Sequence, residues 1–210
     1  MDVTPPLAIP PTAQLLLVRH VRTDMAGRFC GHADPAISAA GERQLASLCR
    51  SLREYRITQV FSSDLRRARQ TAEAIAGGAV PVELVPELRE ISFGQWEGLS
   101  WDEIVARDRD YASRWVDAYP RLGAPEGEDF AAFTARVSRA FQRIADQWQD
   151  GWTAIVTHGG CIRALLIELL GQPPESLGSI PCEFGSFREL HCRRSGGSPP
   201  WLAAPEAGRH

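Results

Sequence analysis

The sequence of 210 residues contains no lysine and no asparagine, and its 23 basic residues are all arginine. The absence of lysine excludes a lysine Schiff base and a P-loop lysine, and the absence of asparagine excludes N-glycosylation. The formal net charge of −3 leaves no broad basic surface for general binding of nucleic acid. Local cationic pockets remain compatible with this balance.

Cysteine is scarce, and long apolar runs are missing. The five cysteines are odd in number, widely spaced and never arranged as Cys-x-x-Cys, which argues against a disulfide framework or a structural zinc site. The N-terminus lacks a basic region, and the apolar run at 15–18 is far too short to span a membrane. We therefore expect reduced thiols, a cytoplasmic location and no membrane partner.

Short apolar runs alternate with segments of helical periodicity between residues 14 and 192. This alternation predicts one α/β domain, a three-layer sandwich whose mostly parallel central sheet has helices on both faces. Strands are expected at 14–19, 57–62, 81–85, 152–157 and 186–192. A long helix is expected to begin near Glu128, and 94–127 is predicted to be a helical insertion over one end of the sheet. Residues 1–13 and 193–210 are predicted to be flexible tails.

Chemically active residue types follow four of the predicted strands. They are Arg19 and His20 after the first strand, Arg67 after the second, Glu90 after the third and His158 after the fourth. In open α/β sheets the site lies at the carboxyl ends of the strands, so these side chains are expected to meet. Phosphoryl transfer needs cations around the phosphoryl oxygens, an in-line nucleophile and a proton donor. The set as a whole therefore predicts a phosphoryl-transfer site, although each residue alone is as well explained by a structural role.

Two glycines separate His158 from a clear amphipathic helix. Gly159 and Gly160 let the backbone approach a ligand closely, and the start of the helix supplies N–H donors for a negative group. The histidines at 20, 32, 158 and 191 show no ligand spacing such as His-x-x-His. Neither a metal nor a cofactor is therefore predicted.

The ordered motifs resemble the histidine phosphatase superfamily, whose fold is phosphoglycerate mutase-like. They are Arg-His…Thr at 19–23, Ser-Asp-Leu-x-Arg-Ala at 63–68, Leu-x-Glu-x-x-Phe-Gly-x-Trp-Glu-Gly at 88–98, Pro-x-Gly-Glu at 125–128 and Thr-His-Gly-Gly at 157–160. The resemblance covers about residues 14–192. It implies a metal-independent phosphoric monoester hydrolase in which His20 becomes phosphohistidine and Glu90 is the general acid and then the base.

The same resemblance implies which residues bind the phosphoryl group. Arg19, Arg67 and His158 would surround it, with the Gly159 N–H and Thr23 as further contacts. Within the superfamily, the tryptophan-rich segment looks most like the alpha-ribazole phosphatases of cobalamin assembly. A broad-specificity phosphatase for small molecules is the wider expectation.

Val21 and Arg22 depart from the family's usual Arg-His-Gly-Glu-Thr motif. Val21 is expected to add bulk beside His20, and Arg22 offers an anion contact at the mouth of the pocket. Trp96 and Trp101 lie in the segment expected to cover the site, where aromatic faces suit stacking on a flat ring. These positions are therefore expected to influence substrate choice.

Two other readings of the sequence stay open. A phosphoglycerate mutase would use the same chemistry, but residues 94–129 contain four arginines against nine acidic residues, which disfavours binding of several anionic groups. A catalytically silent scaffold that binds a phosphorylated ligand would be marked by loss of His20, Glu90 or His158, and all three are present. The expected partner is a small-molecule phosphate ester, and the oligomeric state stays open, with a dimer as one option.

Overall fold

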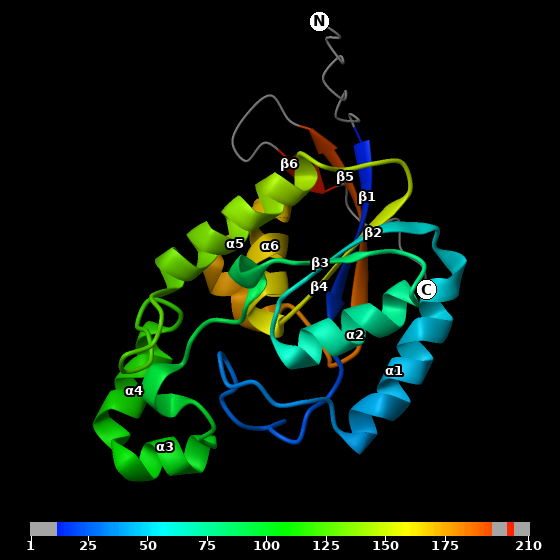
Figure 1. The fold of residues 1–210 in the computed structure, drawn as a ribbon. Coiled ribbons are helices and arrows are strands. Elements are labelled where there is room, and N and C mark those ends of the chain that lie inside the picture. The colour runs from blue at the N-terminus through cyan, green and yellow to red at the C-terminus, as the bar shows by residue number, and fades with distance from the viewer. Residues whose placement is uncertain (1–11, 195–200, 204–210) are drawn as a thin grey trace, which may run out of the picture.

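A computed structural model describes residues 12–194 and 201–203, and at its centre lies a six-stranded sheet in the order β3-β2-β4-β1-β5-β6. The strands are β1 (Thr12–Arg19), β2 (Ile57–Ser62), β3 (Val82–Leu84), β4 (Trp152–Thr157), β5 (Phe187–Arg194) and β6 (Trp201–Ala203). The first four strands are parallel, whereas β5 runs antiparallel to β1 and β6 antiparallel to β5. The predicted α/β fold with a mostly parallel sheet is confirmed (Figure 1).

Helices cover both faces of the sheet. They are α1 (Ala39–Ser51), α2 (Arg66–Ala76), α3 (Trp101–Arg107), α4 (Arg109–Ala118), α5 (Phe130–Ala145) and α6 (Gly159–Leu170), with short 3-10 helices η1 (Leu52–Glu54), η2 (Pro86–Leu88), η3 (Gly94–Trp96) and η4 (Pro174–Ser179). Figure 1 shows α1 and α2 on one face, α5 and α6 on the other, and α3 with α4 set apart from these layers. Within the described residues, no helix is long and apolar enough to cross a membrane.

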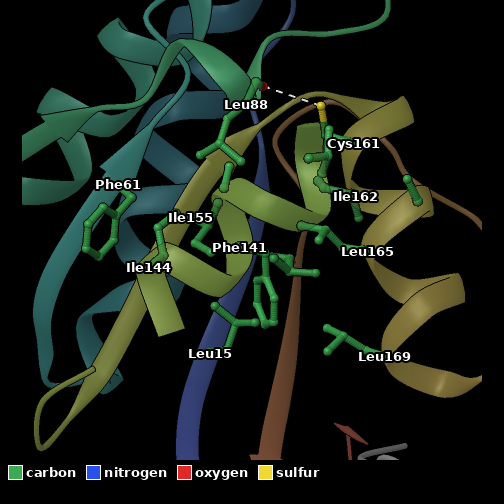
Figure 2. Packing of buried hydrophobic residues seen from close by; sticks show 14 of the residues in the cluster. Leu15, Phe61, Leu88, Phe141, Ile144, Ile155, Cys161, Ile162, Leu165 and Leu169 are labelled. Carbon is green, nitrogen blue, oxygen red and sulfur yellow. Dashed lines mark hydrogen bonds between the residues drawn. The ribbon is translucent and has the colours of Figure 1, made fainter. Parts of the chain in front are cut away.

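The buried strand β1 supplies side chains to two separate cores. Leu15 and Leu17 pack in the cluster of α5 and α6, whereas Leu16 and Val18 pack in the cluster of α1 and α2. Figure 2 shows Leu15 near Phe141 in the first of these clusters. Because both faces of the strand are covered, its sequence is continuously apolar rather than alternating.

The long helix α5 begins where its sequence provides a cap. The carboxylate of Asp129 accepts hydrogen bonds from the backbone N–H groups of Ala131 and Ala132, so Asp129 is the N-cap and the helix begins at the next residue, Phe130, close to the predicted start near Glu128. Its buried face includes Phe133 and Val137, as the helical periodicity predicts. The cap and the apolar face together hold α5 against α6.

The predicted flexible tails are partly wrong. Strand β1 already begins at Thr12, β5 continues to Arg194, and Trp201–Ala203 forms β6 at the edge of the sheet. The pairing of Thr12 with Arg193 and of Arg194 with Trp201 explains the difference, because Ser, Gly and Pro between two strands also mark a connection. The remaining residues of the predicted tails, 1–11, 195–200 and 204–210, lie outside the described residues.

The segment 94–127 is helical and has a small core of its own. That core contains Trp96, Ile104, Ala112 and Ala124. Gly94 has a φ of +49°, and a Cβ atom there would lie 2.3 Å from the carbonyl oxygen of Pro125. The beginning and the end of the insertion therefore meet at a position that only glycine fits.

Candidate active site

The parallel pairing of β1 with β4 brings two histidines to one edge of the sheet. Arg19 is in register with Thr157, so His20 and His158 are the next residues on adjacent strands. The backbone N–H of His20 donates to the Thr157 carbonyl at 3.0 Å, and the two imidazole centroids are 5.0 Å apart. The fold thus places both histidines where the carboxyl ends of parallel strands meet.

Hydrogen bonds fix which nitrogen of His20 carries its proton. Nδ1 lies 2.7 Å from the carbonyl oxygen of Val21, and a carbonyl oxygen can only accept, so Nδ1 is the donor. Nε2 then carries a lone pair, and it lies 3.2 Å from the donating Nε of Arg67. This unprotonated nitrogen is the one available for attack on an electrophile.

Arg67 is the arginine of α2 that points inward, and its side chain is only 1% exposed. Its guanidinium donates to the carbonyl oxygens of Ala33 at 2.6 Å, Gly31 at 2.7 Å and Cys30 at 3.2 Å. Among the described residues no acidic side chain forms an ion pair with it. Its positive charge is therefore solvated by neutral groups and remains available to an anion.

Two further buried groups beside His20 have polar atoms without a partner among the described residues. Arg19 donates to the Cys182 carbonyl and stacks 3.8 Å from the Phe184 ring, but its Nε is buried and unpaired. His158 has Nε2 at 2.9 Å from Oγ of Ser63, and its Nδ1 is buried and unpaired. Buried polar atoms are rarely left unpaired in folded proteins, so these two nitrogens are candidates for contact with a bound ligand.

Burial and neighbouring arginines keep both histidines neutral. Desolvation, followed by the charges of Arg67 and Arg19, holds the pKa of His20 well below its ordinary value. Desolvation and then the charge of Arg67 likewise hold the pKa of His158 well below the ordinary value. Burial also lowers the pKa of the Arg19 guanidinium. The site without a bound anion therefore combines neutral imidazoles with buried cations.

Glu90 lies at the start of α6. Its Oε2 accepts the backbone N–H of Gly160 at 2.9 Å, and its Oε1 accepts the N–H of Ile91 at 3.0 Å. A Cβ atom on Gly160 would lie 2.2 Å from Glu90 Oε1, so the second glycine of the motif makes room for the carboxylate. Arg136, which is paired with Glu128, donates to the Glu90 carbonyl at 2.9 Å and holds this segment in place.

A cavity of about 290 Å³ opens in front of His20, and neither His158 nor Gly159 is part of its lining. Its polar lining includes Arg19, His20, Thr23, Arg67 and Glu90. The rest of its lining is formed by Met25, Gly27, Arg28, Phe29, Cys30, Phe93, Trp101 and Phe184. The part of the chain that the structure describes has no group of three or more His, Cys, Asp and Glu residues placed to hold a metal ion.

A second cavity of about 170 Å³ shares Glu90 with the first. It is lined mainly by apolar groups of the insertion and α5, and Arg163 and Tyr119 also line it. Burial raises the pKa of Tyr119. The carboxylate of Glu90 therefore lies between two cavities, one with Arg19 and Arg67 in its lining and the other lined mainly by apolar side chains.

Of the residues expected to influence substrate choice, Trp101 lies at the cavity and the others do not. Trp101 is 37% exposed and lines the larger cavity, whereas Trp96 is 5% exposed and packs in the core of the insertion, so the expected substrate contact at Trp96 is wrong. Arg22 is exposed but does not line the cavity. Val21 is fully buried in the cluster of α1 and α2, so it adds no bulk in front of His20.

The sequence alone identifies none of Ser63, Arg163, Phe184 and Glu97 as a residue of the site. Ser63 directly follows β2, as His20 and His158 follow their strands, and this shared position is the signal that could have identified it. Arg163 is four residues beyond Gly159 on α6, so helical spacing places it one turn after the glycine pair. Phe184 belongs to the connection before β5 and has no comparable signal.

The chain belongs to the histidine phosphatase superfamily. The profile of branch 1 of this superfamily matches residues 15–202, which includes all the strands except the beginning of β1 and the last residue of β6. Membership supports phosphomonoesterase activity, and it agrees with a site built from two strand-end histidines and buried arginines.

Similar proteins include several phosphatases. The adenosylcobalamin/alpha-ribazole phosphatase of Salmonella typhimurium is 35% identical over 181 residues, which is 84% of this chain and 89% of that protein. Phosphoserine phosphatase 1 of Hydrogenobacter thermophilus is 29% identical over 182 residues, 85% of this chain and 86% of that protein. The crystal structure of the alpha-ribazole phosphatase from Shigella flexneri superposes with a TM-score of 0.79 at 28% identity, covering 91% of this chain and 94% of that one.

The geometry predicts that Arg67 lowers the pKa of His20. In Arg67→Gln the nearest buried charge is lost, so the His20 pKa should rise toward the ordinary value of about 6.5. NMR titration of the His20 imidazole in the free protein measures this directly. The wild-type imidazole should stay neutral as the pH falls through 6.5, and an unchanged or lower pKa in Arg67→Gln would contradict the assignment.

Proposed function

We propose that this protein is a metal-independent phosphomonoesterase that hydrolyses small phosphate esters through a phosphohistidine at His20. The observation that carries the proposal is the tautomer of His20, which its hydrogen bonds fix. Its protonated Nδ1 donates to the Val21 carbonyl, its Nε2 lone pair accepts from Arg67, and both side chains line the cavity. A neutral imidazole with a fixed tautomer is a ready nucleophile, and the buried cations around it attract a phosphate dianion.

In the first half of the reaction, Nε2 of His20 forms a bond to phosphorus while the bond from phosphorus to the ester oxygen breaks. Arg19, Arg67 and His158 hold the phosphoryl oxygens, and the Gly159 N–H and Thr23 are the further contacts. A bound dianion also favours protonation of His158, because its negative charge opposes the effect of the neighbouring arginines. The positive groups thus stabilise the charge that spreads over the phosphoryl oxygens in the transition state.

Glu90 donates a proton in the first half of the reaction and accepts one in the second. In its acid form it gives a proton to the departing ester oxygen, and the resulting carboxylate then takes a proton from the attacking water. The water oxygen forms a bond to phosphorus, the bond to Nε2 breaks, and inorganic phosphate leaves with His20 neutral again. The support for this role is that Glu90 lines the same cavity as His20 and also borders the second, more apolar cavity.

For the substrate we propose alpha-ribazole 5′-phosphate or a similar ester with one phosphate and a flat heteroaromatic group. The Salmonella relative is named for this activity, and the rings of Phe29, Trp101 and Phe184 line the cavity. The cation of Arg28 at the same cavity is already paired with Glu103. This pairing and the acidic excess of the insertion disfavour a phosphoglycerate mutase, which would bind several anionic groups.

A cytoplasmic location is part of the proposal, and the five free cysteines of the structure fit it. A scaffold without activity is less favoured, because the sequence retains His20, Glu90 and His158. An assay of phosphate release separates an enzyme from a scaffold.

The proposed intermediate predicts that wild-type protein can be trapped as an acid-labile, base-stable phosphoenzyme. His20→Ala should show neither the phosphoenzyme nor turnover, because among the described residues His20 is the only histidine that lines the cavity. Rapid quenching with a ³²P-labelled aryl phosphate, in the presence of a chelator throughout, measures both. Turnover by His20→Ala, or inactivation by the chelator that added metal reverses, would disprove the mechanism.

The proposed role of Glu90 predicts a dependence on the leaving group. Glu90→Gln should slow hydrolysis of alkyl phosphates by roughly 10²–10⁴-fold, and of nitrophenyl phosphate much less, because nitrophenolate departs without a proton. Steady-state kcat/KM for a series of esters with different leaving-group pKa values checks this. Equal losses for alkyl and aryl esters would show that Glu90 is not the acid.

The substrate assignment predicts a preference that depends on Trp101. The kcat/KM for alpha-ribazole 5′-phosphate should exceed that for 3-phosphoglycerate at least about tenfold, or roughly 1.4 kcal/mol in transition-state binding. Trp101→Ala should reduce this ratio, and Trp96→Phe, a change within the core of the insertion, should leave it unchanged. A higher kcat/KM for phosphoglycerate or a bisphosphate would overturn the assignment.

A further inference from the structure

We propose that Glu97 is a positioning residue that shapes the segment Cys30–Ala33 and thereby holds Arg67 against His20. This inference rests on the proposed function for its catalytic consequence, but its geometry is independent of the substrate. Glu97 follows η3 at the start of the insertion and does not line the cavity in front of His20. It therefore acts on the reaction only through the residues that it holds.

The carboxylate of Glu97 accepts four backbone hydrogen bonds. Oε2 accepts from the N–H groups of Gly31 at 3.0 Å and Ala33 at 3.0 Å, and Oε1 accepts from those of His32 at 2.9 Å and Phe93 at 2.9 Å. A carboxylate offers about four lone-pair sites, so the acceptor capacity of Glu97 is filled. Three consecutive N–H groups of one segment are thus turned toward a single negative charge.

The opposite side of the same segment holds Arg67. The peptide group between Cys30 and Gly31 donates its N–H to Glu97 and accepts from Arg67 through its C=O. The next peptide group, between Gly31 and His32, does the same. Two adjacent peptide dipoles therefore stand between an anion and a cation, each aligned favourably with both charges.

This arrangement couples the two charges without a direct ion pair. A carboxylate bound directly to Arg67 would neutralise the guanidinium that the phosphoryl group needs. With two peptide groups between them, Glu97 stabilises the buried cation through oriented dipoles without occupying the side of the guanidinium that faces His20. On that side Arg67 Nε donates a hydrogen bond to His20 Nε2.

The close approach of the segment to Glu97 depends on Gly31. A Cβ atom there would lie 2.1 Å from the Ile91 carbonyl oxygen and 2.5 Å from Glu97 Oε1. No side chain fits in that space, so the segment can lie flat between the carboxylate and the guanidinium only with glycine at this position. The clash also shows that Glu97 is in tight contact with the segment.

Glu97→Gln is the first test, because glutamine keeps the size of the side chain but replaces one acceptor oxygen by an NH₂ group. Two of the four N–H groups then lose their acceptor, and the segment can no longer hold Arg67 in place. We expect kcat/KM for an aryl phosphate to fall at least tenfold. We also expect the His20 pKa in the free protein, measured by NMR, to rise toward its ordinary value. Arg67, Arg19, His158 and Glu90 are the titratable groups around His20 in the site, and only the placement of Arg67 should change.

A double-mutant cycle separates positioning from a general loss of structure. In the Arg67→Gln background, Glu97→Gln should have almost no further effect on the His20 pKa or on kcat/KM, because the group that Glu97 positions is already absent. The matched control is Glu73→Gln, an acid-to-amide change at an exposed ion pair on α2, the helix that carries Arg67. It should leave both quantities unchanged.

If Glu97→Gln does not fold, Glu97→Asp provides the second variant, because it retains the charge and withdraws the carboxylate by one methylene group. It should shift the His20 pKa and kcat/KM in the same direction by a smaller factor. A folded variant with a wild-type His20 pKa, or additive effects in the double mutant, would overturn the inference. Failure of the wild-type protein to form phosphohistidine would instead overturn the proposed function, and the NMR titration would still test Glu97.

Discussion

The buried charge of Arg67 is the feature on which the rest of the site depends. An unpaired guanidinium in a protein interior carries a large desolvation cost, which must be offset by well-placed hydrogen-bond acceptors. Here the acceptors are carbonyl oxygens of a loop that is far from Arg67 in the sequence, together with the imidazole of His20. Burial and then the same charge hold the pKa of His20 well below its ordinary value, so Arg67 contributes both to the positive potential of the pocket and to the neutral state of His20.

The site joins two parts of the molecule with different physical roles. The sheet supplies rigid positions, because β1 and β4 fix the histidines through regular backbone pairing. The segments that follow β3 supply Glu90 and Trp101, and the Glu90 segment is held by side-chain contacts such as the one from Arg136 to the Glu90 carbonyl. Under the proposed mechanism, a rigidly held His20 and a separately held Glu90 suit a reaction in which one carboxyl group first donates a proton to the leaving oxygen and then accepts one from water.

Much of this arrangement could be predicted from the sequence, because it follows from strand ends and periodicity. The apolar run that ends at Arg19 and the strand that runs into His158 identify the edge of the sheet where the site lies. The pattern could not distinguish Trp96 from Trp101, since an aromatic residue in a helical insertion packs in a core or faces a cavity with equal ease. It also could not reveal the acceptors of Arg67 or the function of Glu97, because these depend on contacts between segments more than 30 residues apart.

The order of strands in the sheet has a consequence for how the site comes into existence. Strand β4 lies between β1 and β2, although it begins about 130 residues after the end of β1 and about 90 residues after the end of β2. While the protein is being synthesised, His20 and Arg67 are therefore made well before the strand that joins their supports. Such distant pairing is slow to form because a long loop must close first. The emerging polypeptide thus cannot assemble the candidate site until β4 has left the ribosome.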